Sequence, residues 1–209
     1  MKSSIARTPG AVTGGRQVAF VDPLIARYAR EIAADECAHV EFLRTAIGNT
    51  AVAQAAIDIG SSATGAFSSA AQAAGLPPVK ASIRKFPAGR IYLRGCRSER
   101  LQGASPLITN KTFLEAAAGI LAAEAYHAAL TRTVLYSKGL DTPSLRTSAD
   151  KISDARDSLD GSADKDRGIS PRGGASNIVP TDANGIAYSR THRRSAQHRL
   201  SDQAGRSER

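Results

Sequence analysis

The strongest constraint on this chain is a Glu-x-x-His motif that occurs twice, each time near the middle of a long amphipathic helical pattern. The first motif is Glu36 and His39, and the second is Glu124 and His127. Residues three positions apart project from one face of a helix, so each motif places a carboxylate beside an imidazole. Burying such groups is costly unless each has a partner. The pattern predicts an all-α fold with two buried helix faces that each carry a polar pair.

The first helix is predicted over residues 23–47. Asp22 is a favourable N-cap, Pro23 is tolerated at the first helical position, and Gly48 is a residue type favoured just after a helix end. At about 100° per residue, an apolar stripe forms with the first motif in its middle. The residues of the stripe are Ile25, Tyr28, Ala29, Ile32, Val40, Leu43 and Ile47.

The second helix is predicted over residues 113–137. Thr112 and Glu115 have the spacing of a capping box, and Gly139 is placed to end the helix. At about 1.5 Å per residue, each motif lies roughly 18 to 20 Å along its helix, so two packed helices would bring the motifs level. The buried face is predicted to contain Phe113, Ala117, Ile120, Ala128, Thr131, Val134 and Leu135.

The paired motifs indicate a metal site. A carboxylate with an imidazole suits iron, manganese or zinc. In dinuclear four-helix proteins, two helices each supply Glu-x-x-His and two others each supply one Glu. The alternative is a metal-free core in which each His bonds to a neighbouring Glu. Because two motifs at matching depth are far more specific than one, we favour Glu36, His39, Glu124 and His127 as metal ligands, with no catalytic residue assigned.

Three segments resemble ferritin-like proteins of the desiccation-related group of bacteria and plants: EIAADECAHVEFLRTAIG, SPLITNKTFLEAAAGILAAEAYHAALTRTVLY and NIVPTDANGIAYSRT. The resemblance covers roughly residues 10–78 and 103–191. It implies a ferritin-like helical bundle and, by position, the same four ligands. Members of the group have no well-defined catalytic activity, so the resemblance implies a fold more clearly than a reaction.

Two departures make the expected bundle incomplete. We expect the helix that relatives carry before the first motif helix, with its own Glu ligand, to be missing. The third ligand helix, expected before Ser105, is replaced by KFPAGRIYLRGCRSERLQ, residues 85–102, which is basic and has no apolar period. A +1 reading of suitable codons gives N-F-L-L-G-A-S-T-F-E-D-V-G-V-S-A-Y-K, which restores a family pattern. A frame error is therefore one hypothesis and a diverged, solvent-exposed loop is the other; in either case residues 79–103 should be irregular, with no Glu directed at the site.

The net charge of +9 is concentrated in two places. Residues 79–103 carry +6 and residues 188–209 carry +4. These segments have few interleaved aromatic residues and form no recognisable reading helix, so a nucleic-acid-binding protein is only a remote alternative. No apolar run is long enough to span a membrane. Cys37 and Cys96 show no pairing pattern and are expected to be free thiols.

Two short helices are also expected, over residues 61–75 and 148–159, the second with Asp150, Asp154 and Asp157 on its surface. The full organisation comprises four regions. They are an extended N-terminal segment (1–21), a ferritin-like bundle remnant (22–160, disrupted at 79–103), a loop with a docked extended segment (161–191) and a basic disordered tail (192–209).

The expected function is that of a desiccation- or stress-associated ferritin-like protein with a vestigial or weak site for iron or manganese and no demonstrable catalysis. The alternative is a working di-iron or di-manganese carboxylate oxidase, or a metal-storage protein, completed by oligomerisation. Exposed apolar faces of an open bundle make a homo-oligomer the expected assembly. Relatives are often exported to the periplasm or outside the cell, whereas this sequence opens without an apolar signal core, so its compartment stays open.

Overall fold

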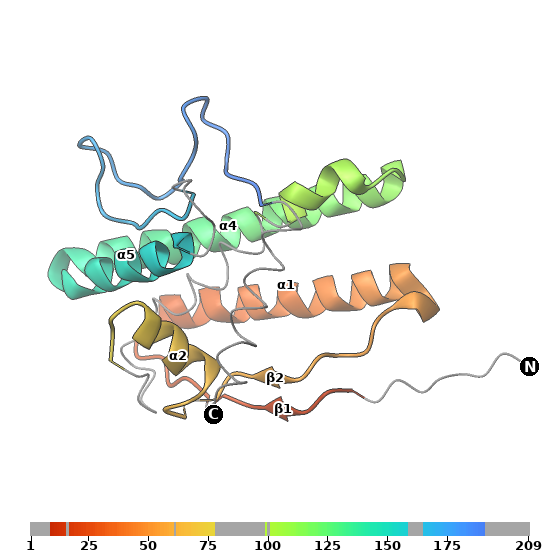
Figure 1. Ribbon diagram of the computed structural model, residues 1–209, viewed down its shortest axis with the longest axis horizontal. Helices are drawn as coiled ribbons and strands as arrows, with labels where there is room; N and C mark the ends of the chain where they lie inside the picture. Colours follow the sequence, from red (N-terminus) through yellow and green to blue (C-terminus); the bar gives the residue numbers. More distant parts are fainter. Residues whose placement is uncertain are drawn as a thin grey trace, which may run out of the picture. The chain divides into compact units, whose positions relative to one another are not determined.

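The computed structural model describes residues 9–15, 17–60, 62–77, 99, 101–158 and 165–190. Over these residues the chain is mostly helical, as predicted (Figure 1). It divides into two compact units, which are described separately. The elements of the first unit are β1 (Val12–Thr13), α1 (Pro23–Ile47), the 3-10 helix η1 (Gly48–Thr50) and β2 (Ile57–Asp58), and α2 (Ala66–Ala73) runs from this unit into the second. The second unit contains the 3-10 helix η3 (Ser105–Leu107), α4 (Lys111–Asp141) and α5 (Ser144–Asp157).

Helix α1 has the ends that the sequence predicts. The Asp22 carboxylate accepts hydrogen bonds from the backbone N–H of Leu24, at 3.0 Å, and of Ile25, at 3.3 Å. At the other end Gly48 has a φ of 60°, a conformation that glycine adopts without strain, and its N–H donates to the carbonyl of Arg44. Local capping signals therefore determine both boundaries of α1.

The apolar stripe of α1 is buried only over its first half. Ile32 is buried at 6 % exposure, whereas Val40 and Leu43 keep 55 % and 43 % of their surface exposed. Within its own unit, the helix of 25 residues has only η1 and two short strands as neighbouring elements. These elements are too small to cover it, so the predicted burial does not extend to the end of the stripe.

A two-stranded parallel pairing in the first unit was not predicted. Val12 pairs with Ile57, and Thr13 with Asp58. The pairing is extended by a hydrogen bond from the Ile57 N–H to the Ala11 carbonyl at 2.9 Å. Each strand has only two residues, too few for an alternation of apolar and polar residues to be recognised in the sequence.

Helix α4 begins and ends differently from the prediction. Its N-cap is Asn110, whose side-chain oxygen accepts a hydrogen bond from the Phe113 N–H at 3.1 Å, so the capping box assigned to Thr112 is wrong. The helix also continues through Gly139 to Asp141. Asn is as good a cap as Thr, and the two candidates stand only two positions apart, so residue type alone did not separate them.

Asn110→Ala should lower the free energy of unfolding by about 1 kcal/mol, because an N–H at the start of α4 loses its acceptor. Thr112→Ala is the matched control on the same turn and should change stability by less than about 0.5 kcal/mol. Equilibrium unfolding in urea measures both. A larger loss for Thr112→Ala than for Asn110→Ala would restore the original capping box.

Gly139 does not end α4, as the sequence predicted, but allows another helix to pack closely against it. A Cβ atom at this position would overlap the Cγ of Arg146, which crosses from α5. The Arg146 guanidinium lies 5.4 Å from the centre of the Tyr136 ring, a cation–π distance. The absence of a side chain at Gly139 thus allows the start of α5 to pack on the end of α4.

The core of the second unit joins residues from four parts of the chain. Ala74 follows α2, Leu135 lies on α4, Ala149 and Ile152 on α5, and Ile169 on the segment of residues 165–190. This segment, drawn in blue, lies beside α4 and α5 (Figure 1). None of the described helices combines the length and apolar composition needed to cross a bilayer.

Several predictions fall on residues that the structure does not describe. The basic tail of residues 192–209, most of residues 79–103 and Cys96 are among them. Cys37 is an exposed free thiol, as predicted. Glu99 and residues 101–104 are helical, so the irregular stretch predicted for this region ends earlier than expected.

Candidate functional site

The second motif is a buried carboxylate–imidazole pair on α4. Glu124 is 4 % exposed and His127 is 5 % exposed. A carboxylate oxygen of Glu124 and a ring nitrogen of His127 lie within 4.8 Å of each other. Metal ligands of these two types bind an ion at about 2.0 to 2.2 Å, so one ion fits between the pair with little side-chain rotation. This half of the predicted site therefore has the burial and the donor atoms that a metal needs.

The first motif lies on α1, in the other compact unit. Glu36 and His39 are both partly buried, and their spacing places them on one face of the helix. The structure thus brings Glu124 close to His127 within one unit and presents Glu36 with His39 in the other. The meeting of the two motifs across a helix contact stays a prediction.

A buried group of two carboxylates and two guanidinium groups lies in the second unit, and sequence analysis missed it. Arg156 Nη2 lies 2.5 Å from Asp166 Oδ1 and 3.4 Å from Glu99 Oε2. Arg190 forms ion pairs with the same two carboxylates. Glu99 is therefore held by arginines of its own unit.

Arg132 fixes the segment of residues 165–190 to α4. Its guanidinium is buried and donates four hydrogen bonds, all to backbone carbonyls of that segment. Five N–H donors in a planar fork allow a single arginine to bind several acceptors at once. The acceptors are the carbonyls of Ile178 at 2.8 Å, Arg167 at 3.1 Å, Gly168 at 2.6 Å and Asn177 at 2.5 Å.

Burial, and after it the nearby charge of Arg156, lowers the pKa of Arg132 to about 10. A pKa of about 10 still leaves the guanidinium protonated at neutral pH. Arg132 is thus a buried cation whose charge is solvated by carbonyl dipoles. The sequence signal that could have revealed this role of Arg132 is the presence of a cation on an otherwise apolar helix face.

Two aspartates of α5 hold the start of the same segment. Asp150 Oδ1 accepts from the N–H of Ile169 at 2.7 Å and of Ser170 at 3.1 Å. Asp157 Oδ1 accepts from the N–H groups of the first two described residues of the segment, at 2.9 and 3.3 Å. Both aspartates were predicted to lie on the helix surface, and the structure shows them half-buried and bound to backbone N–H groups. No sequence pattern indicates these donors, because they come from residues far along the chain.

Comparison with known proteins gives one match. A family model described as a ferritin-like domain matches residues 8–137. The matched range includes both Glu-x-x-His motifs and most of α4. No curated protein and no solved structure gives a significant match to the chain.

Proposed function

Because this chain belongs to the ferritin-like domain family, we propose that it is a stress-associated protein whose two Glu-x-x-His motifs form one weak metal site. The observation that supports the proposal is the burial of Glu124 and His127 on one face of α4. A buried carboxylate beside a buried imidazole is costly in a dry core, and a cation between them offsets that cost. The resemblance of both motif helices to the desiccation-related group supports the stress-associated role.

The donor set fits one ion better than two. Glu36, His39, Glu124 and His127 supply two carboxylates and two imidazoles. Dinuclear sites of this fold use a Glu from each of two further helices. Iron or manganese is the metal class that carboxylate and imidazole ligands suit, and when bound it supplies redox or Lewis-acid chemistry. The proposed site therefore binds a single ion weakly, and we propose no catalytic step for it.

Metal titration of the full chain tests this proposal. We expect manganese(II) or iron(II), titrated without oxygen, to bind at no more than about one ion per chain. Glu124→Gln should weaken binding by about tenfold or more, because even residues that only orient a metal ligand often contribute this much. Glu115→Gln is the matched control, since Glu115 is exposed on the same helix and should leave binding unchanged.

The outcomes separate the shared site from its alternatives. Glu36→Gln should weaken binding as much as Glu124→Gln if the two motifs meet, and an effect confined to Glu124→Gln would show that they do not. Near two ions per chain, together with a stable dimer, would favour a dinuclear oxidase or storage protein completed by a second copy. No binding by the unmodified chain would support a metal-free core.

A frame error over residues 85–102 is a separate proposal. At the end of this range, Glu99 contacts two arginines, and Gln102 donates a hydrogen bond to the Ala187 carbonyl at 3.2 Å. The contacts of Glu99 and Gln102 favour divergence, and not a frame error, at the C-terminal end of residues 85–102. The family pattern restored by the +1 reading favours a frame error in the earlier part of the same range. The nucleotide sequence of codons 80–104 decides between a frame error and a diverged segment. A frame error requires that the +1 reading of these codons encode the helix pattern of relatives.

A further inference from the structure

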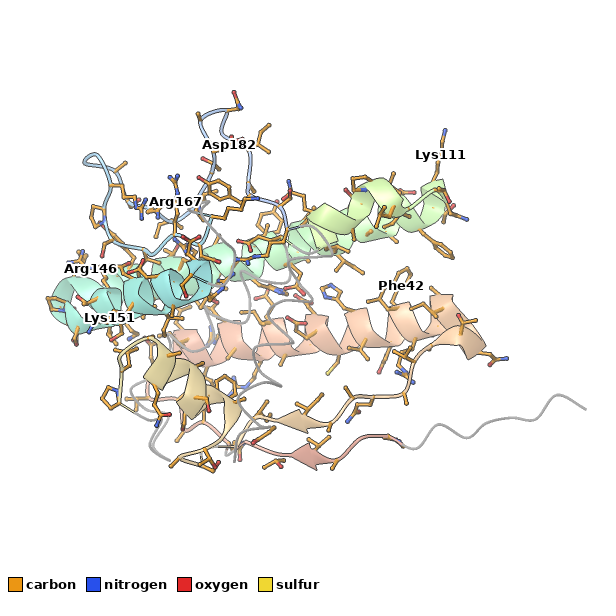
Figure 2. All side chains as sticks on the ribbon, viewed as in Figure 1. Phe42, Lys111, Arg146, Lys151, Arg167 and Asp182 are labelled. Atoms are coloured by element: carbon orange, nitrogen blue, oxygen red, sulfur yellow. The ribbon has the colours of Figure 1, made fainter. Side chains whose placement is uncertain are left out.

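A tight turn over residues 182–185 lies in the last part of the segment of residues 165–190. Figure 2 labels Asp182, in the loop that projects at the top of the view. The Gly185 N–H closes the turn by donating to the Asp182 carbonyl at 3.1 Å. Gly185 has a φ of 73°, a conformation that glycine adopts without strain. The turn thus has a defined geometry, although Asn184 and Gly185 are both exposed.

The Asp182 carboxylate stabilises this closed turn. Its Oδ1 accepts hydrogen bonds from the N–H groups of Asn184, at 2.8 Å, and of Ile186, at 3.0 Å. The bond from Ile186, and after it the bond from Asn184, lowers the pKa of Asp182 below its ordinary value. Asp182 is therefore charged at neutral pH, where its hydrogen bonds are strongest.

Asn184 is followed by glycine, and this distinguishes it from the other asparagines of the chain. The side-chain amide of an asparagine can be attacked by the backbone nitrogen of the next residue. A glycine at that position has no Cβ to obstruct the approach, whereas a larger side chain hinders it. The other asparagines, Asn49, Asn110 and Asn177, precede Thr50, Lys111 and Ile178.

We propose that Asn184 is a deamidation site, which the closed turn protects and which reacts when the turn opens. The backbone nitrogen of Gly185 attacks Asn184 Cγ, so that an N–Cγ bond forms and the Cγ–Nδ2 bond breaks. Ammonia leaves with the proton that the Gly185 nitrogen loses, and the product is a cyclic succinimide. Water then opens this ring at either carbonyl, which gives aspartate or isoaspartate. The reaction needs water and no other reactant.

The hydrogen bonds of the closed turn oppose the first step. The Gly185 N–H donates to the Asp182 carbonyl, and the nitrogen must leave this acceptor before it can approach Asn184 Cγ. The Asn184 N–H is held by the Asp182 carboxylate at the same time. The reaction is therefore limited to the fraction of time in which the turn is open, an equilibrium of local opening.

The product disfavours closure of the turn. Either product places a new carboxylate near that of Asp182, and like charges repel. Isoaspartate also lengthens the main chain by a methylene, which displaces the N–H groups of Gly185 and Ile186 from their acceptors. Deamidation thus converts a transient opening into a lasting one. No step involves the Glu-x-x-His motifs, so the proposal is independent of the metal site.

Peptide mass spectrometry of the full chain, incubated at mildly alkaline pH, tests the proposal by following the conversion of Asn184 over time. We expect conversion in guanidinium chloride, where the turn is lost, to be at least about tenfold faster than in the folded chain. Asp182→Ala should speed conversion in the folded chain by about five-fold, because the turn loses two hydrogen bonds to a charged acceptor. In guanidinium chloride this variant and the unmodified chain should convert at the same rate.

Two further variants keep the result specific. Asp58→Ala is the matched control, because Asp58 also binds a backbone N–H, that of Gly60 at 2.8 Å, but in the other unit. It should leave the conversion of Asn184 unchanged. Gly185→Ala should slow conversion in guanidinium chloride by about tenfold, since a Cβ then obstructs the attacking nitrogen.

Hydrogen exchange tests the effect of the product. The converted chain, separated by its added negative charge, should exchange the amide hydrogen of Ile186 about five-fold faster than the unmodified chain. Unchanged exchange would overturn the claim that conversion keeps the turn open. The proposed site itself is overturned if another asparagine converts first in denaturant, if the folded chain reacts as fast as the denatured chain, or if Asp182→Ala has no effect.

Discussion

Arg132→Met is expected to lower the free energy of unfolding by about 3 to 5 kcal/mol, the largest effect of any substitution considered for this chain. The long methionine side chain keeps much of the packing volume but removes every donor. Four backbone carbonyls of the segment of residues 165–190 then lose the guanidinium that binds them. Each buried carbonyl left without a donor costs about 1 to 3 kcal/mol, and local entry of water recovers part of that cost.

Urea unfolding followed by circular dichroism measures the Arg132→Met effect, with Lys151→Met on the exposed face of α5 as the control. The stability loss for Arg132→Lys should fall between those of Arg132→Met and Lys151→Met, because an ammonium has fewer donors and lacks the planar fork.

The contribution of Arg132 to the free energy of unfolding should not vary with pH near neutrality. The pKa of Arg132 is lowered to about 10 in the folded chain, so the unfolded chain holds the proton more tightly and stability rises only as pH increases beyond about 10. A loss below about 1 kcal/mol for Arg132→Met would show that the segment is held in other ways.

Asp166→Asn is the second large effect and should lower the free energy of unfolding by about 3 kcal/mol or more. The Asp166 side chain is 1 % exposed and forms ion pairs with Arg156 and Arg190. The neutral amide leaves Glu99 as the one remaining carboxylate between two guanidinium groups in this group of four. Uncompensated charge in a buried setting is more costly than the loss of an exposed ion pair.

A double variant identifies charge as the cause. Asp166→Asn combined with Arg190→Met should be less destabilised than the sum of the two single variants, because the second change removes a cation that the first left uncompensated. Glu115→Gln, which replaces an exposed carboxylate of α4 by an amide, should change stability by less than about 0.5 kcal/mol. Strict additivity of the two single variants would contradict a coupled ion group.

The sequence was sufficient to predict features that depend on interactions between residues close together along the chain. Asp22 and Gly48 define α1 because a cap acts within one turn of the helix that it ends. The burial of Glu124 and His127 also followed from their place on an amphipathic face. At Asn110, local reasoning failed because two residue types that both favour the N-cap position, Asn and Thr, stand two positions apart.

The sequence was insufficient where partners lie far apart along the chain. Arg132 and the Ile178 carbonyl are 46 positions apart, and Arg190 and Glu99 are 91 positions apart. Neither spacing corresponds to a helical or strand period, so no pattern in one sequence links them. For the same reason Asp150 was predicted to lie on the surface. The proposed four-residue metal site would also require a distant pairing, between residues of α1 and α4, and this pairing stays a prediction that the titration described above tests.

The way in which Arg132 holds its segment also determines which positions evolution can change. A carbonyl group is present whatever side chain a residue carries, so substitutions at Ile178 leave its acceptor in place. At Asn177 the carbonyl would also remain, but the side chain that donates to the Gly168 carbonyl at 2.6 Å would be lost. Gly168 is different, because any Cβ there would overlap Asp150. Positions bound only through their carbonyl groups can therefore change while the segment keeps its path. The selective constraint falls instead on Arg132, on Gly168 and on the carboxylates that bind the segment or its arginines, Asp150, Asp157 and Asp166.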